Sequence, residues 1–372
     1  MSHAMNIKSI SALYRETHAV SHARTRLKGD SQVNHALDCR ISRESEWSRK
    51  QSTTVQAQET FDTVEELNTV CGIRPGFEDV PKTVTKYHET VKEAVKERVI
   101  FDNDTKLHNH VKTLVKQGHF LNLLQTSHMD ATWQSFLYDL PKGTMKFLLN
   151  SCVDTLPTLA NLQLWGKSPT SRCPMPGCSN KQTGNHIFSC CKVYLESGRY
   201  LWRHNAVISY ITKMIDTKAF TVFSDIPGYT TAGGGTIRAD LCPTLEKPDL
   251  VLIDEKKKTV ELFELTVPGE LRISESNKLK ADRYSHFKTD IVSYKTTVTP
   301  FEISVKGHVT RENRDRLRRI HKFTDKSKTL KKFIQDISYI AILSTYYIYI
   351  ARNEPAWSDP PFITPPSNKV NE

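Results

Sequence analysis

The feature that most constrains the fold of this chain is a set of cysteine and histidine residues between positions 173 and 191. Cys173 and Cys178 stand at the two ends of the hexapeptide Cys-Pro-Met-Pro-Gly-Cys, and His186 and Cys191 follow. A Pro/Gly turn can bring both thiols to one ion, and three thiolates with a neutral imidazole form a tetrahedral set that zinc prefers. The pattern predicts a structural zinc site, because four protein ligands leave no open position for water.

Two alternatives to this ligand set remain open. Cys190 directly precedes Cys191 and could take its place as the fourth ligand. The cysteines could also be free buried thiols, because cysteine often behaves as a small hydrophobic residue. The chain has eight cysteines in 372 residues and no N-terminal apolar segment, which favours a reducing compartment over a secreted disulfide-bonded fold.

A second pattern begins at Asp249, which ends the tripeptide Lys-Pro-Asp. The apolar run 250–253 predicts a buried strand, the polar stretch 254–258 predicts a turn, and alternation over 259–267 predicts the return strand of a hairpin. Such a hairpin can bring Asp249 near Glu264. Two neighbouring carboxylates can bind a hard divalent cation such as magnesium, which polarises a phosphodiester and activates water. An ordinary hairpin with solvated acids is the alternative.

A predicted helix over 274–284 supplies positive charge close to this hairpin in the sequence. Lys280 and Tyr284 are four residues apart, a spacing that places both side chains on one helix face. Lys280 could therefore supply the cation needed beside the pentacovalent phosphate of a hydrolysis reaction. An exposed basic helix without a catalytic role is the alternative.

From about residue 157 onward, these motifs resemble the C-terminal part of non-LTR retrotransposon polyproteins that carry a restriction-like endonuclease. In such proteins a Cys-Cys-His-Cys set precedes the nuclease, as it does here. The similarity covers most of the chain, is weaker over residues 35–47, and is most specific between residues 156 and 307. Its further signposts are Leu-Pro-Thr-Leu-Ala-Asn-Leu-Gln-Leu-Trp-Gly-Lys at 156–167, Arg-His-Asn at 203–205, Lys-Pro-Asp at 247–249, Glu-Leu-Thr-Val-Pro at 264–268 and Phe-Glu-Ile-Ser-Val-Lys-Gly at 301–307.

The resemblance implies a PD-(D/E)XK fold, in which a twisted mixed sheet flanked by helices presents Asp249 and Glu264 to magnesium. Lys280 would replace the lysine usually found two residues after the second carboxylate, where this chain has Thr266. Lys278 is an alternative to Lys280 and is also a candidate contact for a nucleic-acid phosphate. In the same comparison Tyr284 would steady the phosphate or the lysine, and Arg203 would clamp a DNA phosphate. Glu261 should lie on the opposite face of its strand from Glu264.

The resemblance implies a magnesium-dependent endonuclease that nicks DNA in the nucleus, with element RNA and a polymerase-bearing retrotransposon protein as further partners. Such polyproteins also carry a reverse transcriptase with a Tyr/Phe-Ala-Asp-Asp turn, and this chain has no such sequence. Without those aspartates it should not polymerise DNA. The alternative function is an inactive nucleic-acid-binding remnant of the retrotransposon protein.

The charge of the chain agrees with a nucleic-acid partner. Lys and Arg number 52 against 41 acids, which gives a formal net charge of +11 and favours salt-sensitive attraction to phosphate. The basic segment 311–322 predicts an amphipathic helix, with Arg318 and Arg319 as phosphate contacts. A solvated helix with internal ion pairs is the alternative.

The resulting fold class is α+β, with a helical N-terminal and linker region, a Cys-Cys-His-Cys zinc knuckle and a restriction-endonuclease-like core with a mixed sheet. The apolar run 337–351 is shorter than the roughly 20 residues that span a bilayer, so it predicts a packed helix and no membrane contact. The predicted segments are a poorly ordered basic or helical segment 1–60, a helical linker 61–155 that includes His119, Phe120 and Leu123, a zinc region 156–200, a nuclease domain 201–351 and a disordered tail 352–372.

Overall fold

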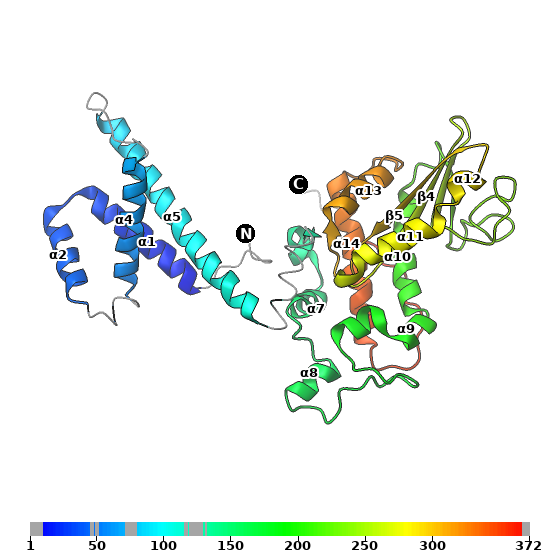
Figure 1. Ribbon diagram of the computed structural model, residues 1–372, viewed down its shortest axis with the longest axis horizontal. Helices are drawn as coiled ribbons and strands as arrows, with labels where there is room; N and C mark the ends of the chain where they lie inside the picture. The colour runs from blue at the N-terminus through cyan, green and yellow to red at the C-terminus, as the bar shows by residue number, and fades with distance from the viewer. Residues whose placement is uncertain are drawn as a thin grey trace. The chain divides into compact units, whose positions relative to one another are not determined.

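The structure, a computed structural model, describes residues 10–44, 48, 52–70, 80–114, 118, 129–130 and 132–366. The chain forms two compact units, Met1–Thr113 and Leu114–Glu372. Its architecture is α+β, with a helical N-terminal part, a Cys/His cluster and a mixed four-stranded sheet with helices (Figure 1). The predicted linker residues His119, Phe120 and Leu123 lie outside the described residues.

The first unit is a small helical bundle. It contains α1 (Ile10–Lys28), α2 (Ser31–Ser42), α4 (Thr53–Val70) and α5 (Val80–Thr113). Small and β-branched side chains of α1, α4 and α5, among them Ala19, Ala57 and Val95, form one core cluster. Beside this cluster, the Gln58 amide oxygen of α4 lies 2.7 Å from a ring nitrogen of His22 and accepts a hydrogen bond from Arg26, both on α1.

This packing corrects the predicted division near residue 60. The segment 1–60 was expected to be poorly ordered because it has few large apolar residues. Its helices instead share a core with α5, so the unit boundary falls after Thr113. Alanine allows the helices to approach closely, which lets a helix with few large side chains be buried.

The second unit is built on a sheet with strand order β2-β3-β4-β5. The strands are β2 (Thr221–Ser224), β3 (Leu250–Asp254), β4 (Thr259–Thr266) and β5 (Lys295–Glu302). The β2–β3 and β3–β4 pairs are antiparallel, and β4–β5 is parallel. The predicted hairpin is confirmed by the β3–β4 pair. A short antiparallel pair, β1 (Met129–Asp130) with β6 (Val309–Thr310), forms a separate sheet.

Helices cover both faces of the four-stranded sheet. On one face, Leu252, Phe263 and Leu265 share a core with α10 (Arg199–Met214), α13 (Arg311–His321) and α14 (Leu330–Ile350). On the other face, Val251 and Leu262 pack with α11 (Ile273–Tyr284) and α12 (Phe287–Asp290), which cross the sheet in Figure 1. Burial on both faces explains why β3 is apolar at nearly every position.

The remaining elements of this unit are short. They are η1 (Thr132–Asp139), α7 (Lys142–Cys152), α8 (Leu159–Leu164), η2 (His186–Cys190), α9 (Lys192–Glu196) and η3 (Glu270–Arg272). Cys173, Ile187 and Phe188 belong to the same core cluster as Phe263 of the sheet. The zinc region and the sheet region therefore share one core, and the predicted boundary at residue 200 does not separate two compact units.

The long C-terminal helix α14 confirms the predicted packed helix. Thr329 caps its start by accepting a hydrogen bond from the Lys332 amide at 3.3 Å. Phe147 of α7 packs against Tyr349 near its end, with ring centroids 5.1 Å apart. No helix in the described part of the chain is long and apolar enough to cross a membrane.

The segment after α14 corrects the predicted disordered tail as far as residue 366. Arg199 donates a hydrogen bond to the Ala351 carbonyl oxygen at 2.8 Å, and its guanidinium lies over the Trp357 ring. The Trp202 indole donates to the Pro360 carbonyl oxygen at 2.7 Å. The proline-rich composition of this segment does not show that Trp357 and Pro360 will be held by Arg199 and Trp202 of α10. Residues 367–372 lie outside the described part of the chain.

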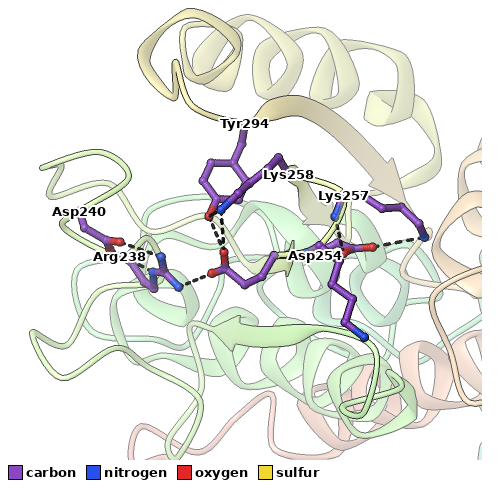
Figure 2. A network of polar contacts seen from close by, with 8 residues as sticks. Arg238, Asp240, Asp254, Lys257, Lys258 and Tyr294 are labelled. Carbon is purple, nitrogen blue, oxygen red and sulfur yellow. Dashed lines mark hydrogen bonds and ion pairs between the residues drawn. The ribbon is translucent and has the colours of Figure 1, made fainter.

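A polar network fixes the turn end of the β3–β4 hairpin (Figure 2). Asp254 accepts hydrogen bonds from the backbone amides of Lys256 and Lys257 at 3.1 and 3.0 Å. Arg238, in the loop between β2 and β3, forms ion pairs with Asp240 and Glu255. Glu255 therefore ties the β2–β3 loop to the hairpin, and Asp254 holds the turn itself.

Candidate functional site

The four predicted zinc ligands lie together. The ligand atoms of Cys173, Cys178, His186 and Cys191 are all within 4.8 Å of one another. The Cys178 Sγ atom lies 3.4 Å from the His186 Nε2 atom. These separations suit donors that share one ion, so the group could hold a metal such as zinc.

Local backbone contacts position the ligands. The Cys173 amide donates to the Asn180 carbonyl oxygen at 2.8 Å, and the Cys178 amide donates to Met175 at 3.0 Å. Between these two cysteines, Gly177 has a φ of 77°, a conformation that glycine adopts without strain. The Tyr200 hydroxyl of α10 accepts a hydrogen bond from the Cys191 amide at 3.1 Å. The cluster is thus tied directly to the helix that borders the sheet.

The protonation of the ligands depends on whether a metal is bound. Burial raises the pKa of the Cys173 thiol to about 12, and it also raises the pKa of Cys191, with the neighbouring thiols adding to both shifts. Burial lowers the pKa of His186, which keeps the imidazole neutral and able to act as a ligand. Without a metal the buried thiols are therefore protonated, and a coordinating metal would deprotonate them.

The structure distinguishes the two candidates for the fourth ligand. Cys191 is buried within the cluster, whereas the neighbouring Cys190 is exposed and lies outside it. The Cys190 Sγ atom accepts a hydrogen bond from the Asn185 side-chain amide at 3.5 Å. A turn of helix, η2, separates His186 from Cys191 and directs the two adjacent thiols in different directions.

The second site lies at the end of the β3–β4 hairpin opposite its turn. Asp249 directly precedes β3, one position beyond the Leu250–Phe263 pair, and therefore faces Glu264 across the strands. The Asp249 amide donates to Glu264 Oε1 at 3.2 Å, and the Leu265 amide donates to Asp249 Oδ2 at 2.7 Å. The predicted approach of the two carboxylates is confirmed by these contacts.

Helix α11 brings a cation to this carboxylate pair. The Lys280 Nζ atom donates to Glu264 Oε2 at 2.7 Å and lies 5.7 Å from the centroid of the Tyr284 ring. Lys280 and Tyr284 therefore share a helix face, as their spacing predicted. Tyr284 is buried, and both burial and the Glu264 carboxylate raise its pKa above its ordinary value. Its position suits support of Lys280 better than contact with a phosphate.

His204 is a fourth member of the site that the sequence did not single out. It projects from α10, and its Nε2 atom lies 3.0 Å from Asp249 Oδ2, while its Nδ1 atom lies 3.0 Å from Asn205 Oδ1. In the sequence, the only indication of His204 is that the Arg-His-Asn tripeptide at 203–205 is one of the motifs that carry the resemblance to retrotransposon proteins. A lone histidine on a helix does not indicate its partner in the sequence.

Electrostatic coupling gives the two carboxyls different pKa values. Burial and the neighbouring Asp249 raise the pKa of Glu264 to about 7. Burial also acts on Asp249, but His204 and Lys280 outweigh it and hold the Asp249 pKa below its ordinary value. Burial opposes protonation of His204, yet the Asp249 carboxylate raises the His204 pKa to about 9. Asp249 is therefore charged at neutral pH and paired with an imidazolium.

Part of this site opens onto a groove of about 530 Å³. Asp249, His204 and Lys280 line it together with η3 and the start of α10. The groove also reaches Ser189, within the segment that carries the zinc-ligand cluster. Glu264 is fully buried behind this lining, in contact with Asp249 and Lys280.

Three of the predicted phosphate contacts, Arg203, Lys278 and Arg318, differ in how exposed they are. Arg203 is only 2% exposed and donates to the carbonyl oxygens of Phe188 at 2.8 Å and Val267 at 3.2 Å. These bonds tie the zinc segment to the end of β4, so Arg203 is corrected from a DNA contact to a structural residue. Lys278 is exposed and does not line the groove, and Arg318 is half exposed beside Asp315.

Arg319 and Glu261 form a bidentate ion pair on the other face of the sheet. The Arg319 Nη2 atom lies 2.9 Å from both Glu261 carboxylate oxygens. Glu261 therefore points toward α13 and away from Lys280, as the strand alternation predicted. The pair leaves Arg319 40% exposed, so part of the guanidinium still faces solvent.

Comparison with known protein families finds no family model that matches the chain, and comparison with curated proteins finds no significant match.

Proposed function

We propose that this protein is a metal-dependent DNA endonuclease of the PD-(D/E)XK type, derived from a non-LTR retrotransposon. The observation that carries the proposal is the contact between Lys280 and Glu264, because a lysine from a distant helix reaches the carboxylate where the chain has Thr266 in the usual lysine position. The order of elements α10, β2, β3, β4, α11 and β5 supports the proposed fold.

Asp249 and Glu264 are the residues that would hold magnesium. Their carboxylates are adjacent and largely buried, and the pKa of Glu264 is raised first by burial and then by repulsion from Asp249, both of which a divalent cation would offset. When bound, magnesium would supply Lewis-acid polarisation of the phosphate and a water of lowered pKa. Oxygen donors of this kind are the ligands that magnesium prefers.

The other site residues act on the phosphate and on the carboxylates. Lys280 places an ammonium beside Glu264 at the edge of the groove, where it can stabilise negative charge that develops on a phosphate. His204 holds the Asp249 carboxylate in one orientation. The zinc-ligand cluster supports the groove through Tyr200, which also borders it.

The test is nicking of supercoiled plasmid by the purified chain with magnesium. We expect Glu264→Gln to abolish nicking, because it removes a charged metal ligand without changing the size of the side chain. Glu261→Gln is the matched control, since Glu261 lies on the same strand but pairs with Arg319 on the opposite face. The control should nick at the rate of the parent.

The outcome also separates the proposal from a binding-only remnant. Magnesium-dependent nicking by the parent and by Glu261→Gln, but not by Glu264→Gln, would support a nuclease. Retention of DNA in a gel shift without nicking by any of the three proteins would instead favour a nucleic-acid-binding module held together by the zinc-ligand cluster and basic helices.

A further inference from the structure

Three exposed leucines form an apolar rim around the proposed catalytic groove. Leu195 of α9, Leu201 of α10 and Leu279 of α11 all line this depression, and they are 63%, 56% and 64% exposed. They come from three different helices, and all three side chains border the same groove. Single exposed leucines are common on protein surfaces, but three that border one groove beside the proposed active site indicate a ligand with apolar surface.

The position of the rim limits what that ligand can be. Leu201 is three residues before His204 on α10, and Leu279 directly precedes Lys280 on α11. A molecule bound on these two leucines therefore lies next to His204, Lys280 and Asp249, which line the same groove. Arg272 also lines the groove, and it forms an ion pair with Glu275 at 3.4 Å. The groove combines cations that suit phosphate with apolar side chains that cannot bond to it.

In a continuous DNA duplex, the outer surface consists of phosphate and sugar, and the base faces are hidden by stacking. Leucine side chains inserted between base steps are a known means of unstacking and kinking a duplex. Enzymes that take a base out of the stack also hold its face between aromatic and apolar side chains. A continuous duplex offers leucine only sugar C–H groups and thymine methyls. Base faces released from the stack are larger apolar surfaces, and they suit a rim of three leucines better.

We propose that Leu195, Leu201 and Leu279 contact unstacked bases beside the cut position, so that the preferred substrate is DNA whose strands are separated there. This inference rests on the proposed nuclease function and names its substrate class. On an intact duplex the rim must itself hold the bases apart, at a cost of a few kcal/mol per step. On DNA that is already unpaired at that position, the cost is absent.

The test compares two labelled substrates of one sequence, a perfect duplex and the same duplex with a short mismatched bubble at the nick position. The full-length parent, the double variant Leu201→Ala/Leu279→Ala and the control Leu245→Ala are assayed with magnesium. Leu245 is 99% exposed and lies in the β2–β3 loop outside the groove. All of these side chains are largely exposed, so the variants should fold.

We expect the parent to cleave the bubble faster than the duplex. The double variant should lose duplex cleavage by about tenfold or more while it keeps most of its bubble cleavage. The Leu245→Ala control should behave as the parent. An equal loss on both substrates, or no loss on either, would overturn the inference, and in the second case the rim would be a surface for a protein partner.

A binding measurement keeps the inference separate from the nuclease proposal. With calcium in place of magnesium, 2-aminopurine at the nick position should gain fluorescence when the parent binds the duplex and gain much less with the double variant. Unstacking without cleavage of any substrate would refute the nuclease and keep the base contact. Cleavage by the parent with no gain in fluorescence would support the nuclease and refute the base contact.

Discussion

At the scale of single residues, the environments of two lysines on α11 decide which of them serves the site. Lys280 contacts Glu264 and borders the groove, whereas Lys278 is exposed and does not line it. We expect Lys280→Met to lower the nicking rate by about a hundredfold, because removing one preorganised charge from a reacting oxyanion typically costs this much. Lys278→Met is the matched control and should change the rate by less than about threefold, a difference read from initial nicking rates.

The carboxylate pair also predicts how stability depends on pH without added magnesium. Burial and the neighbouring Asp249 raise the pKa of Glu264 from 4.5 to about 7. A carboxyl with a higher pKa in the folded state stabilises the fold fully below the unfolded value, and this contribution is lost as the pH rises through the folded value. The free energy of unfolding should therefore fall by on the order of 2 kcal/mol from about pH 4.5 to about pH 7.

In Glu264→Gln this fall should be much smaller, since glutamine does not titrate and can still accept hydrogen bonds from Lys280 and the Asp249 amide. Urea unfolding of the parent and the variant across this pH range measures the effect. His204 acts mainly at higher pH, because its contribution is lost between its ordinary pKa of 6.5 and its folded pKa of about 9. Equal slopes in both proteins below pH 7 would show that another group is responsible.

Individual site residues differ in how far sequence could predict them. The Cys/His ligands, Asp249 and Glu264 were found because short spacing and strand alternation fix which side chains can meet. Arg203 was misassigned, because an arginine on a helix gives no sign in the sequence that carbonyl oxygens will surround it. His204 was missed because its contact with Asp249 joins residues 45 positions apart.

At the scale of elements, the turn between β5 and β6 is pressed against α14. Gly307 has a φ of 73°, and a Cβ atom there would lie 2.8 Å from Ile342 Cδ1 and 3.0 Å from the Ser338 carbonyl oxygen. Gly307→Ala should therefore lower the free energy of unfolding by about 3 kcal/mol, from backbone strain and overpacking together.

Gly228→Ala separates these two causes. Gly228 has a φ of 88° but no atom within 4 Å of the Cβ position, so only the backbone term of about 1 kcal/mol should appear. Both variants are compared with the parent by denaturant unfolding. A Gly307→Ala protein no less stable than Gly228→Ala would show that α14 does not pack closely on this turn.

The helical turn η2 makes a separate prediction about the metal. Cys191→Ser should reduce bound zinc to well below one ion per chain, because it removes a ligand whose atom lies within 4.8 Å of the other three. Cys190→Ser should keep the zinc, since Cys190 lies outside the cluster. Elemental analysis of the purified proteins measures zinc content directly, and loss in both variants would contradict the ligand assignment.

The metal should also contribute to stability. Structural zinc supplies folding free energy, and Cys173 and Cys191 share a core cluster with the sheet. Removal of zinc by a chelator should lower the thermal midpoint of the parent and change that of Cys191→Ser much less. A chelator effect of equal size on both proteins would point to a different ion.

Elements were more predictable from sequence than the boundaries between units. Strand and helix periodicity gave the hairpin, α11, α13 and α14, because one buried face imposes a repeat on each. Packing between elements leaves no such repeat. The segments 1–60 and 352–372 were therefore expected to be poorly ordered, although helices α1 and α4 pack on α5, and residues 352–366 contact α10.

At the scale of the whole molecule, the two compact units have separate cores. The N-terminal cluster contains residues 19–99 only, whereas the clusters around the sheet contain residues 147–349. All of the ligand and site residues belong to the second unit. A fragment that begins at Leu114 should therefore keep its zinc, its thermal midpoint to within about 3 °C of the corresponding transition in the full chain, and its magnesium-dependent nicking.

Deletion of residues 353–372 is the comparison, because residues 353–366 of this segment pack within the second unit. Trp357 would be lost from Trp202 and Arg199, and the Trp202 indole would lose its acceptor, the Pro360 carbonyl oxygen. This deletion should lower the midpoint by about 5 °C or more, since each kcal/mol shifts a unit of this size by a few degrees. Calorimetry measures the thermal midpoints of the full chain, the fragment from Leu114 and the C-terminal deletion. A fragment from Leu114 that unfolds as early as the C-terminal deletion would show that the second unit depends on the first.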